Sequence, residues 1–437
     1  MKMRCFIFLL CGGFVVTALA HRQIIQFHSK YKKGLYRNFS LLLQFNAEVT
    51  HAPLEQAEQT PGLQTIHTLT EKNSEFGFNL YRKIANLHED NVFFSPSTIS
   101  TTFAMLSLGA KQATRFNILQ GLHIQDLANG SNKYQLHRLF KWLHSNITSN
   151  KDLFISQGNS LFMQDDLELK QTFINDLTHY YNVEIFRVNF QDRVKTKNTI
   201  NQYVHNRTNG KIIKLLDSVD AGAKLMFANY ILFKGEWKSP FEPNLTIDGT
   251  FYVNAYTRVK VPMMHKEGSF LLTYDEYYSC IVLKLPYKGH ASMLVVIPMD
   301  NGYQLLEDEL SADLIGRWIE AMRFKHVDLY FPKFKLDKSY KMEKKLRQLG
   351  MIVPFTNSAD LSGISSSYQL KITEVIHKAV INVDERGTEA AGVTGTFALP
   401  YSLPPVIKVD HPFLFTIHED ITKTLLFIGR VKDPTKQ

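Results

Sequence analysis

Apolar side chains recur at helical spacing in the first part of the chain, before about residue 180. From Asn73 onward they return every three or four residues, which predicts an amphipathic helix. Ser97–Leu108 and Ser131–Thr148 repeat this spacing and should also be helices. Residues 21–72 show no sustained period and are mostly polar, so we expect a poorly ordered N-terminal arm there.

The later region of the chain is dominated by strand patterns. Its apolar runs are rich in β-branched and aromatic residues and are separated by turn signals. The runs predict strands, the last two forming a hairpin, at Leu225–Phe233, Cys280–Tyr287, Ser292–Met299, His411–His418 and Thr424–Val431. Since no Gly/Ser linker divides the two regions, we expect one α+β domain over residues 73–437.

The N-terminus has the pattern of a secretory signal peptide, residues 1–20. Lys2 and Arg4 precede the apolar stretch Phe6–Val16, and Ala18–Ala20 supplies a small-residue cleavage site. The chain has no later apolar run of the ~18 residues that span a bilayer. The sequence therefore predicts a secreted, extracellular protein without a transmembrane segment.

The cysteines and the N-glycosylation sequons are consistent with secretion. Cys5 and Cys11 lie in the signal, so Cys280 is the mature chain's only cysteine. Its apolar neighbours favour a buried, inert thiol over a reactive one. A glycoprotein is expected, because five Asn-X-Ser/Thr sequons could accept glycans: Asn38, Asn129, Asn146, Asn206 and Asn244.

The sequence lacks the local signatures of common catalytic and metal sites. There is no G-x-S-x-G, H-E-x-x-H, G-x-G-x-x-G or Walker loop, and no cysteine pair for zinc. We therefore expect neither an enzyme nor a metal site. The net charge of +9 permits an anionic partner without indicating a nucleic acid.

The segment Asp384–Pro405 has an unusual composition. Read as a strand, one phase from Thr388 to Ala398 contains only small, uncharged residues. The other phase contains the one charge, Glu389, which would face solvent if the small phase lay over a packed layer. A flexible loop is the alternative, but threonine and valine favour a strand that could enter an existing sheet.

Four motifs, in order along the chain, resemble the serpins, the serine-protease-inhibitor superfamily, and its antitrypsin-like clade in particular. The stretch "VINVDERGTEAAGVT" resembles the serpin hinge. The others are "NVFFSPSTIS", "NYILFKGEWKSPF" and "KVDHPFLFTI", beginning at Asn91, Asn229 and Lys408. The resemblance implies a serpin fold of three β-sheets and about nine helices, with an exposed reactive-centre loop at about residues 385–405.

The resemblance also assigns residues to the regions that control the loop. The hinge would comprise Glu385, Gly387, Thr388, Glu389, Ala390, Ala391, Gly392 and Val393. The breach, where the loop enters the sheet, would contain Trp237 and a Glu385–Lys333 pair. The shutter, a hydrogen-bonded cluster under the sheet, would contain Ser95, Thr98, Asn229 and His377.

The family mechanism is suicide inhibition. A protease attacks the loop, becomes esterified to it, and is trapped when the freed loop inserts as a new strand. Antitrypsin-type serpins are cleaved at the seventeenth residue counted from the hinge glutamate. Counting from Glu385 gives Tyr401, so the resemblance places the reactive bond at Tyr401–Ser402.

A more detailed resemblance bears on which protease the chain would inhibit. The loop and the runs around it are similar to a serpin that inhibits coagulation factor Xa in plasma, with protein Z, phospholipid and calcium as cofactors. Tyr256 and Glu89 match residues of its protein Z docking surface, but Asn254 stands where an acid is expected. A tyrosine before the cleaved bond also suits a chymotrypsin-like protease acting without protein Z.

Two further hypotheses remain open. A heparin site would use Lys133, Arg138 and Lys141 on the third predicted helix, where His137 and His144 follow the same face. A merely solvated helix face is the alternative. The chain could also be a non-inhibitory ligand carrier, although such serpins often tolerate bulky hinge residues. In either case we expect a monomer.

Overall fold

The computed structural model describes residues 61–128, 134–150, 152–299, 303–366, 369–387 and 404–437. Their α-helices are α2 (Leu63–Ala85), α3 (Pro96–Gly109), α4 (Gln112–Gly121), α5 (Gln125–Ala128), α6 (Gln135–Thr148), α7 (Gln171–Tyr181), α8 (Arg193–Arg207), α9 (Tyr303–Glu309), α10 (Ala312–Ala321) and α11 (Glu343–Gln348). Two 3₁₀ turns are η1 (Pro243–Leu245) and η2 (Val353–Phe355). Within the described residues, no helix is both long enough and apolar enough to cross a bilayer.

The strands of the described residues form two hydrogen-bonded sheets. The five-stranded sheet has the order β10 (Phe334–Lys341), β11 (Glu374–Val383), β4 (Leu225–Gly235), β2 (Leu153–Gln164) and β3 (Glu184–Val188). The nine-stranded sheet has the order β1 (Val92–Phe94), β14 (Leu425–Val431), β13 (Phe413–Glu419), β8 (Ala291–Pro298), β7 (Cys280–Pro286), β6 (Arg258–Asp275), β9 (Arg323–Pro332) and β12 (Val406–Lys408), with β5 (Ile247–Tyr252) also on β6.

The α+β serpin fold is confirmed, and the predicted strands are present. The resemblance implied three sheets, whereas hydrogen bonding joins two of them into one. The reason is β6, which is 18 residues long and pairs with β5, β7 and β9. A strand of that length continues from one layer into the next.

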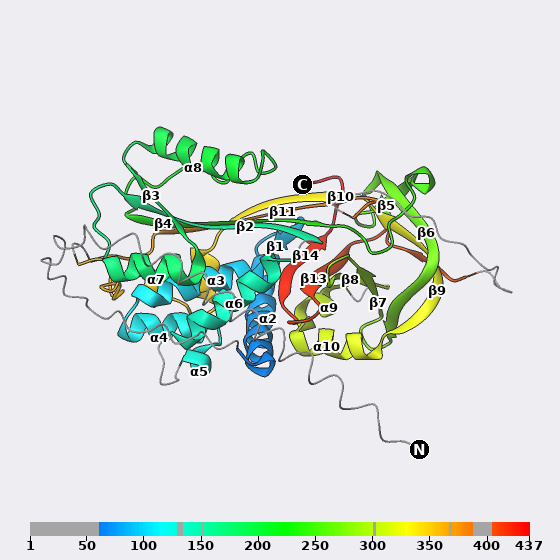
Figure 1. Ribbon diagram of the computed structural model, residues 1–437. Helices are drawn as coiled ribbons and strands as arrows, with labels where there is room; N and C mark the ends of the chain where they lie inside the picture. The colour runs from blue at the N-terminus through cyan, green and yellow to red at the C-terminus, as the bar shows by residue number, and fades with distance from the viewer. Residues whose placement is uncertain (1–60, 129–133, 151, 300–302, 367–368, 388–403) are drawn as a thin grey trace, which may run out of the picture. The chain divides into compact units, whose positions relative to one another are not determined.

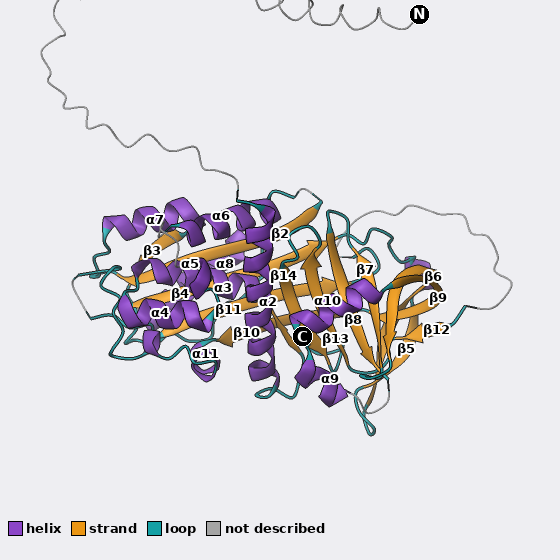
Figure 2. Cartoon of the chain, turned by 90° about the horizontal axis from the view of Figure 1, so that it is seen from below, coloured by secondary structure: helices purple, strands orange, loops and turns teal. Residues whose placement is uncertain are grey.

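The five-stranded sheet lies between helices on both faces. Figure 1 shows α8 over one face and α3, α6 and α7 under the other; Figure 2 shows the helices from below, beside the strands of the nine-stranded sheet. The odd-numbered apolar residues of β4 belong to the main core, and its even-numbered ones to a smaller core beneath α8. Burial on both faces explains why β4 is apolar almost throughout.

Helix α2 begins at Leu63, well before the predicted start at Asn73. Buried polar residues interrupt its apolar pattern: Thr70 donates to the Thr422 carbonyl, and Asn73 accepts from Ser100. Helix α6 begins at Gln135, not at Ser131, since Tyr134 is its cap and residues 131–133 lie outside the described ranges.

Candidate functional site

The seam between β4 and β11 runs through the centre of the five-stranded sheet. The strands are hydrogen-bonded neighbours in parallel, from Glu374 opposite Met226 to Ile381 opposite Phe233. Their side chains alternate between the two cores. Separating the strands would therefore break one ladder of backbone hydrogen bonds and disrupt packing in both cores.

The chain reverses direction directly after β11. Asp384 and Gly387 exchange two backbone hydrogen bonds of 3.1 Å, which close a tight turn. Gly387 also pairs antiparallel with Glu236, the residue that follows β4. Gly387 thus lies between the continuations of both strands, at the mouth of the seam.

Only glycine suits this position. Gly387 has φ +108°, a region that side-chain-bearing residues rarely adopt. A Cβ atom there would lie 2.3 Å from the Gly235 carbonyl oxygen and 2.4 Å from the Trp237 nitrogen. Both are backbone atoms, so neither could move aside without disturbing the end of β4.

Trp237 anchors the turn to the end of β4. Its indole Nε1 donates to the Asp384 carbonyl at 3.0 Å, and its backbone N–H donates to the Arg386 carbonyl at 3.0 Å. The ring is buried and stacks on Tyr287 with centroids 4.3 Å apart. The breach tryptophan named by the sequence therefore contacts the hinge directly.

Glu385 is held by three neighbours. Its carboxylate accepts from Lys333 Nζ at 2.8 Å and from Thr246 Oγ1 at 2.8 Å, and its carbonyl accepts from the Phe241 N–H. Burial alone would raise the pKa of Glu385, but the hydrogen bonds from Lys333 and Thr246 outweigh it, so the pKa lies below its ordinary value. The hinge carboxylate is thus ionised at neutral pH.

A second cluster, the shutter, crosses the middle of the seam. His377 on β11 lies opposite Asn229 on β4, and its Nδ1 is 2.5 Å from Asn229 Oδ1. The Ser95 N–H at the start of α3 donates to His377 Nε2 at 3.0 Å, and Thr98 Oγ1 lies 3.4 Å from Nδ1. Asn229 donates to Thr102 at 2.6 Å. The cluster ties both strands to α3.

The hydrogen bonds fix the protonation of His377. Nε2 accepts from Ser95, so the ring proton resides on Nδ1, where it can be donated to Asn229. The side chain is fully buried, and this burial lowers the pKa of His377 to about 3. His377 is therefore neutral over the physiological range.

The proposed cleavage site lies outside the described residues. Residues 388–403 include Tyr401, Ser402 and the hinge positions from Thr388 to Val393. The described structure resumes at Pro404, just before β12. The structure describes the residues on either side of this segment, Gly387 and Pro404.

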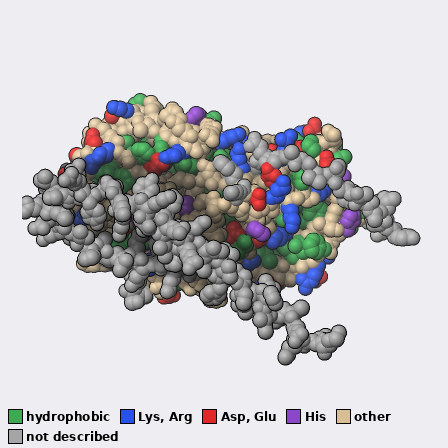
Figure 3. Space-filling view, in the orientation of Figure 1, with side chains coloured by type: hydrophobic (Ala, Val, Ile, Leu, Met, Phe, Trp, Pro, Cys, Tyr) green, Lys and Arg blue, Asp and Glu red, His purple; other side chains and the backbone are tan. Residues whose placement is uncertain are grey.

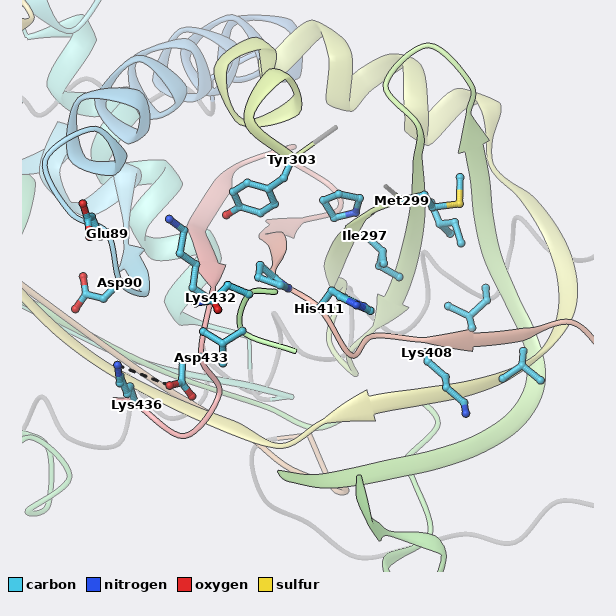
Figure 4. A pocket seen from close by; sticks show the side chains of 17 residues that line it. Glu89, Asp90, Ile297, Met299, Tyr303, Lys408, His411, Lys432, Asp433 and Lys436 are labelled. Carbon is cyan, nitrogen blue, oxygen red and sulfur yellow. Dashed lines mark ion pairs between the residues drawn. The ribbon is translucent and has the colours of Figure 1, made fainter. Parts of the chain in front are cut away.

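The residues assigned to protein Z docking lie at or near a cleft of about 1200 Å³ (Figure 4). Glu89, Asn254 and Tyr303 line it together with Lys408 and other residues of the nine-stranded sheet. Tyr256 is not among the lining residues, but it follows Asn254 in the same turn and is 98% exposed. An aromatic ring so exposed is available to a partner.

The predicted basic face of α6 needs correction. His137 is buried, with Nδ1 2.6 Å from the Tyr181 hydroxyl, so it does not follow Lys141 on a solvated face. Lys141 Nζ lies 3.3 Å from His179 of α7, and Arg138 is only half-exposed. Lys133 lies outside the described residues. Away from α6, Figure 3 shows Lys and Arg side chains interspersed with acidic ones over the nine-stranded sheet.

Three predicted glycan acceptors are described and exposed: Asn146 on α6, Asn206 on α8 and Asn244 in η1. Asn38 and Asn129 lie outside the described ranges. Cys280 is buried, as predicted, and burial raises the pKa of its thiol to about 12. Among the residues that the structure describes, no group of three His, Cys, Asp or Glu could hold a metal ion.

Sequence reasoning missed two residues of these clusters. Thr246 bonds the hinge glutamate and Thr102 bonds Asn229, yet each is one threonine among many. Thr102 stands one helical turn after Thr98, a spacing that could have indicated it. Thr246 carries no local signal apart from its place in a sequon.

Comparison with known proteins gives one consistent result. The family model described as "Serpin (serine protease inhibitor)" matches residues 71–434. The protein Z-dependent protease inhibitor of Mus musculus is 41% identical over 375 residues, covering 85% of this chain and 84% of that protein. The alpha-1-antiproteinase of Rattus norvegicus is 40% identical, covering 87% and 92%.

Solved structures agree. The crystal structure of the mouse protein Z-dependent protease inhibitor superposes with a TM-score of 0.80 at 41% identity, covering 85% of this chain and 98% of that one. Human thyroxine-binding globulin in complex with thyroxine gives a TM-score of 0.79 at 32% identity, covering 85% and 99%.

Proposed function

The chain belongs to the serpin family of serine protease inhibitors, and from this premise we propose that it traps its target by inserting residues after Gly387 into the β4–β11 seam. The observation that carries the proposal is the double pairing of Gly387 with Asp384 and Glu236. A strand that follows this glycine already starts between both edges.

The register of that pairing supports insertion without rearrangement of the hinge. Gly387 is opposite Glu236 and Asp384; seven residues before these lie Asn229 and His377, which already face each other across the seam. Seven residues after Gly387 lies Thr394. An antiparallel strand in this register would therefore bring the Thr394 hydroxyl between the two shutter side chains.

Insertion would carry the attached protease a long distance and would release free energy. About 14 residues at ~3.3 Å each span roughly 45 Å, enough to carry an attached protease far across the inhibitor. New ladder hydrogen bonds at about 1 kcal/mol each, with burial, give on the order of 15 to 30 kcal/mol. The protease serine would form an ester with the Tyr401 carbonyl, and Ser402 would leave as the new amino terminus.

We propose coagulation factor Xa as the target and protein Z as the cofactor, on calcium-containing phospholipid. The support is the similarity to inhibitors named for protein Z and the exposed Tyr256 beside the cleft that Glu89 lines. Factor Xa prefers arginine, so a tyrosyl bond would react slowly unless protein Z raises the effective concentration. Inhibition of a chymotrypsin-like protease without protein Z is the second candidate.

A carrier role is the third candidate, because a thyroxine-binding globulin is among the structural neighbours. The small residues from Thr388 to Val393 favour the inhibitor. We also propose that the protein is secreted into plasma and carries N-glycans. Its heparin site would use Lys133, Arg138 and Lys141. Charge reversal of Arg138 and Lys141 should reduce the salt dependence of any heparin binding.

The test is formation of a covalent adduct. The secreted protein is incubated with factor Xa and with chymotrypsin, each with and without protein Z and calcium-containing phospholipid vesicles. We expect an SDS-stable adduct with factor Xa that depends on protein Z and is slowed in Tyr401→Ala.

Thr388→Arg is the matched control because its arginine cannot enter the packed layer. It should be cleaved without forming an adduct. Cleavage of the unmodified protein without any adduct would contradict the inhibitor proposal. An adduct with chymotrypsin alone would support the second candidate.

A further inference from the structure

We propose that Asn244 carries an N-glycan and that this glycan guards the mouth of the seam against strands of other molecules. The inference rests on the proposed secretory route and on the proposed loop insertion. Among the three sequons in the described residues, this one has its threonine bonded to the hinge. In the others, Thr148 donates to His144 and Thr208 donates to Val204, each within its own helix.

The turn that carries Asn244 is fastened to the hinge at both ends. Before it, the Phe241 N–H donates to the Glu385 carbonyl at 2.8 Å; after it, Thr246 Oγ1 donates to the Glu385 carboxylate at 2.8 Å. Asn244 itself is exposed. Since two residues span at most ~7 Å, the Asn244 Cα lies within about that distance of the Thr246 Cα, and its glycan would emerge beside the hinge contact.

Attachment uses ordinary secretory chemistry. The donor is a lipid-linked oligosaccharide pyrophosphate. Asn244 Nδ2 forms a bond to the anomeric carbon of the first sugar, the bond from that carbon to the phosphate oxygen breaks, and the lipid pyrophosphate leaves with the electron pair. The amide gives up one proton. Thr246 serves twice, as the sequon hydroxyl before folding and as a hinge donor afterwards.

The glycan would hinder strands of other molecules but not the chain's own loop, because the two reach the seam by different routes. The chain's own loop already starts inside the mouth, because Gly387 lies between Asp384 and Glu236. A strand from another molecule that enters at this end must instead arrive from solvent, past the turn that carries Asn244. A seam able to accept a strand is an association hazard, and a bulky hydrated group at its entrance blocks intermolecular entry while leaving the intramolecular route open.

The test compares glycan variants of the full chain, expressed in a secretory host. Asn244→Gln removes the glycan and keeps the Thr246 hydroxyl, whereas Thr246→Ser keeps both and Thr246→Ala removes both. Asn206→Gln is the matched control, since it removes a sequon from α8. The probe is a synthetic peptide TEAAGVTGTFAL, the sequence of residues 388–399. Glycan occupancy is read by intact mass, and peptide uptake by the rise in the thermal midpoint.

We expect wild type, Thr246→Ser and Asn206→Gln to carry the Asn244 glycan and to take up the peptide slowly. Asn244→Gln should take it up several-fold faster. Thr246→Ala should be as fast or faster, with a lower midpoint before the peptide is added. An unmodified Asn244 in wild type, or equal uptake by wild type and Asn244→Gln, would overturn the proposal.

Adduct formation with the protease, measured on the same preparations, separates the two proposals. Asn244→Gln should form it at the wild-type rate. Absence of an adduct in every preparation would contradict the proposed inhibition, whereas a glycan-dependent rate of peptide uptake would still support the guard.

Discussion

The breach and the shutter act on the same seam but are built differently. At the breach, Lys333 and Glu385 form an ion pair whose lysine side chain is 35% exposed. At the shutter, His377 and Asn229 are 0% and 1% exposed and are joined by hydrogen bonds between neutral groups. Water can replace a broken contact at the breach, whereas a broken contact at the shutter leaves buried polar groups without partners.

The difference separates two tasks. The breach positions the hinge, since Glu385, Trp237 and Gly387 all meet at the turn after β11. The shutter adds to the energy needed to separate β4 from β11, because opening the seam breaks the His377–Asn229 contact as well as the backbone ladder. A strand carrying a hydroxyl in the proposed register would restore hydrogen bonding there. Changes to the two clusters should therefore differ in size and in their response to pH and salt.

The largest effect is expected from His377→Ala. It leaves the Ser95 N–H without an acceptor and Asn229 Oδ1 without a donor in a buried site, which should cost about 3 kcal/mol of stability. Denaturant unfolding monitored by circular dichroism measures it. His326→Ala, at a half-exposed pair with Glu267, is the control and should change stability by less than about 1 kcal/mol. Equal losses in both would remove the distinction between a buried and an exposed cluster.

The second-largest loss of stability, about 2 kcal/mol, is expected from Gly387→Ala. The φ of +108° at this position and the backbone atoms of Gly235 and Trp237 leave no room for a methyl group. The thermal midpoint and the yield of covalent adduct should both fall. Gly268→Ala is the matched control, since a Cβ there meets nothing closer than 3.7 Å. If the two alanine variants have the same thermal midpoint and adduct yield, the close backbone contacts of Gly387 matter neither for stability nor for inhibition.

Acidification should weaken the shutter, and also the surroundings of His418, whose pKa burial likewise lowers, to about 4. Burial lowers the folded-state pKa of His377 to about 3, whereas the unfolded chain binds the proton near the ordinary value. The unfolded state therefore gains protons first, and stability is lost as pH falls below about 6.5, by roughly 2 kcal/mol between pH 7 and 5. Urea unfolding at a series of pH values measures this slope. His377→Gln has no such proton to gain, so an identical slope in that variant would assign the effect to other groups.

The smallest effect is expected at the breach ion pair. Lys333→Ala should cost about 1 kcal/mol, because the pair is partly solvated, and the difference from wild type should shrink at high salt. Thermal unfolding at low and high ionic strength measures it. Lys288→Ala, which breaks a more exposed pair with Glu236, is the control. A salt-independent loss larger than that of His377→Ala would reverse the ranking of the two clusters.

Much of this arrangement could be predicted from sequence. Because β4 is buried on both faces, Leu225–Phe233 is a nearly continuous apolar run, and motif resemblance named Trp237, Lys333 and His377. Regions where buried residues are polar were harder. Helix α2 was placed too late because Thr70 and Asn73 are buried polar residues whose hydrogen-bond partners, Thr422 and Ser100, lie elsewhere in the chain. His137 was misplaced because Tyr181 provides it with a buried partner. Nothing in the local sequence indicates such distant partners.

The pairing across the seam could not be read from sequence either. Alternation predicts which face a side chain takes but does not say that β11 joins β4 in parallel, or that His377 meets Asn229. Such pairings depend on the long segments between the strands. The same holds for Thr246, whose partner Glu385 follows more than a hundred residues later.

The structure of the protein after cleavage between Tyr401 and Ser402 would show whether the loop inserts. We expect a six-stranded sheet in which the new strand runs antiparallel between β4 and β11, with Thr394 opposite both Asn229 and His377. A cleaved molecule in which β4 and β11 are still hydrogen-bonded to each other from Met226 to Phe233 would contradict it.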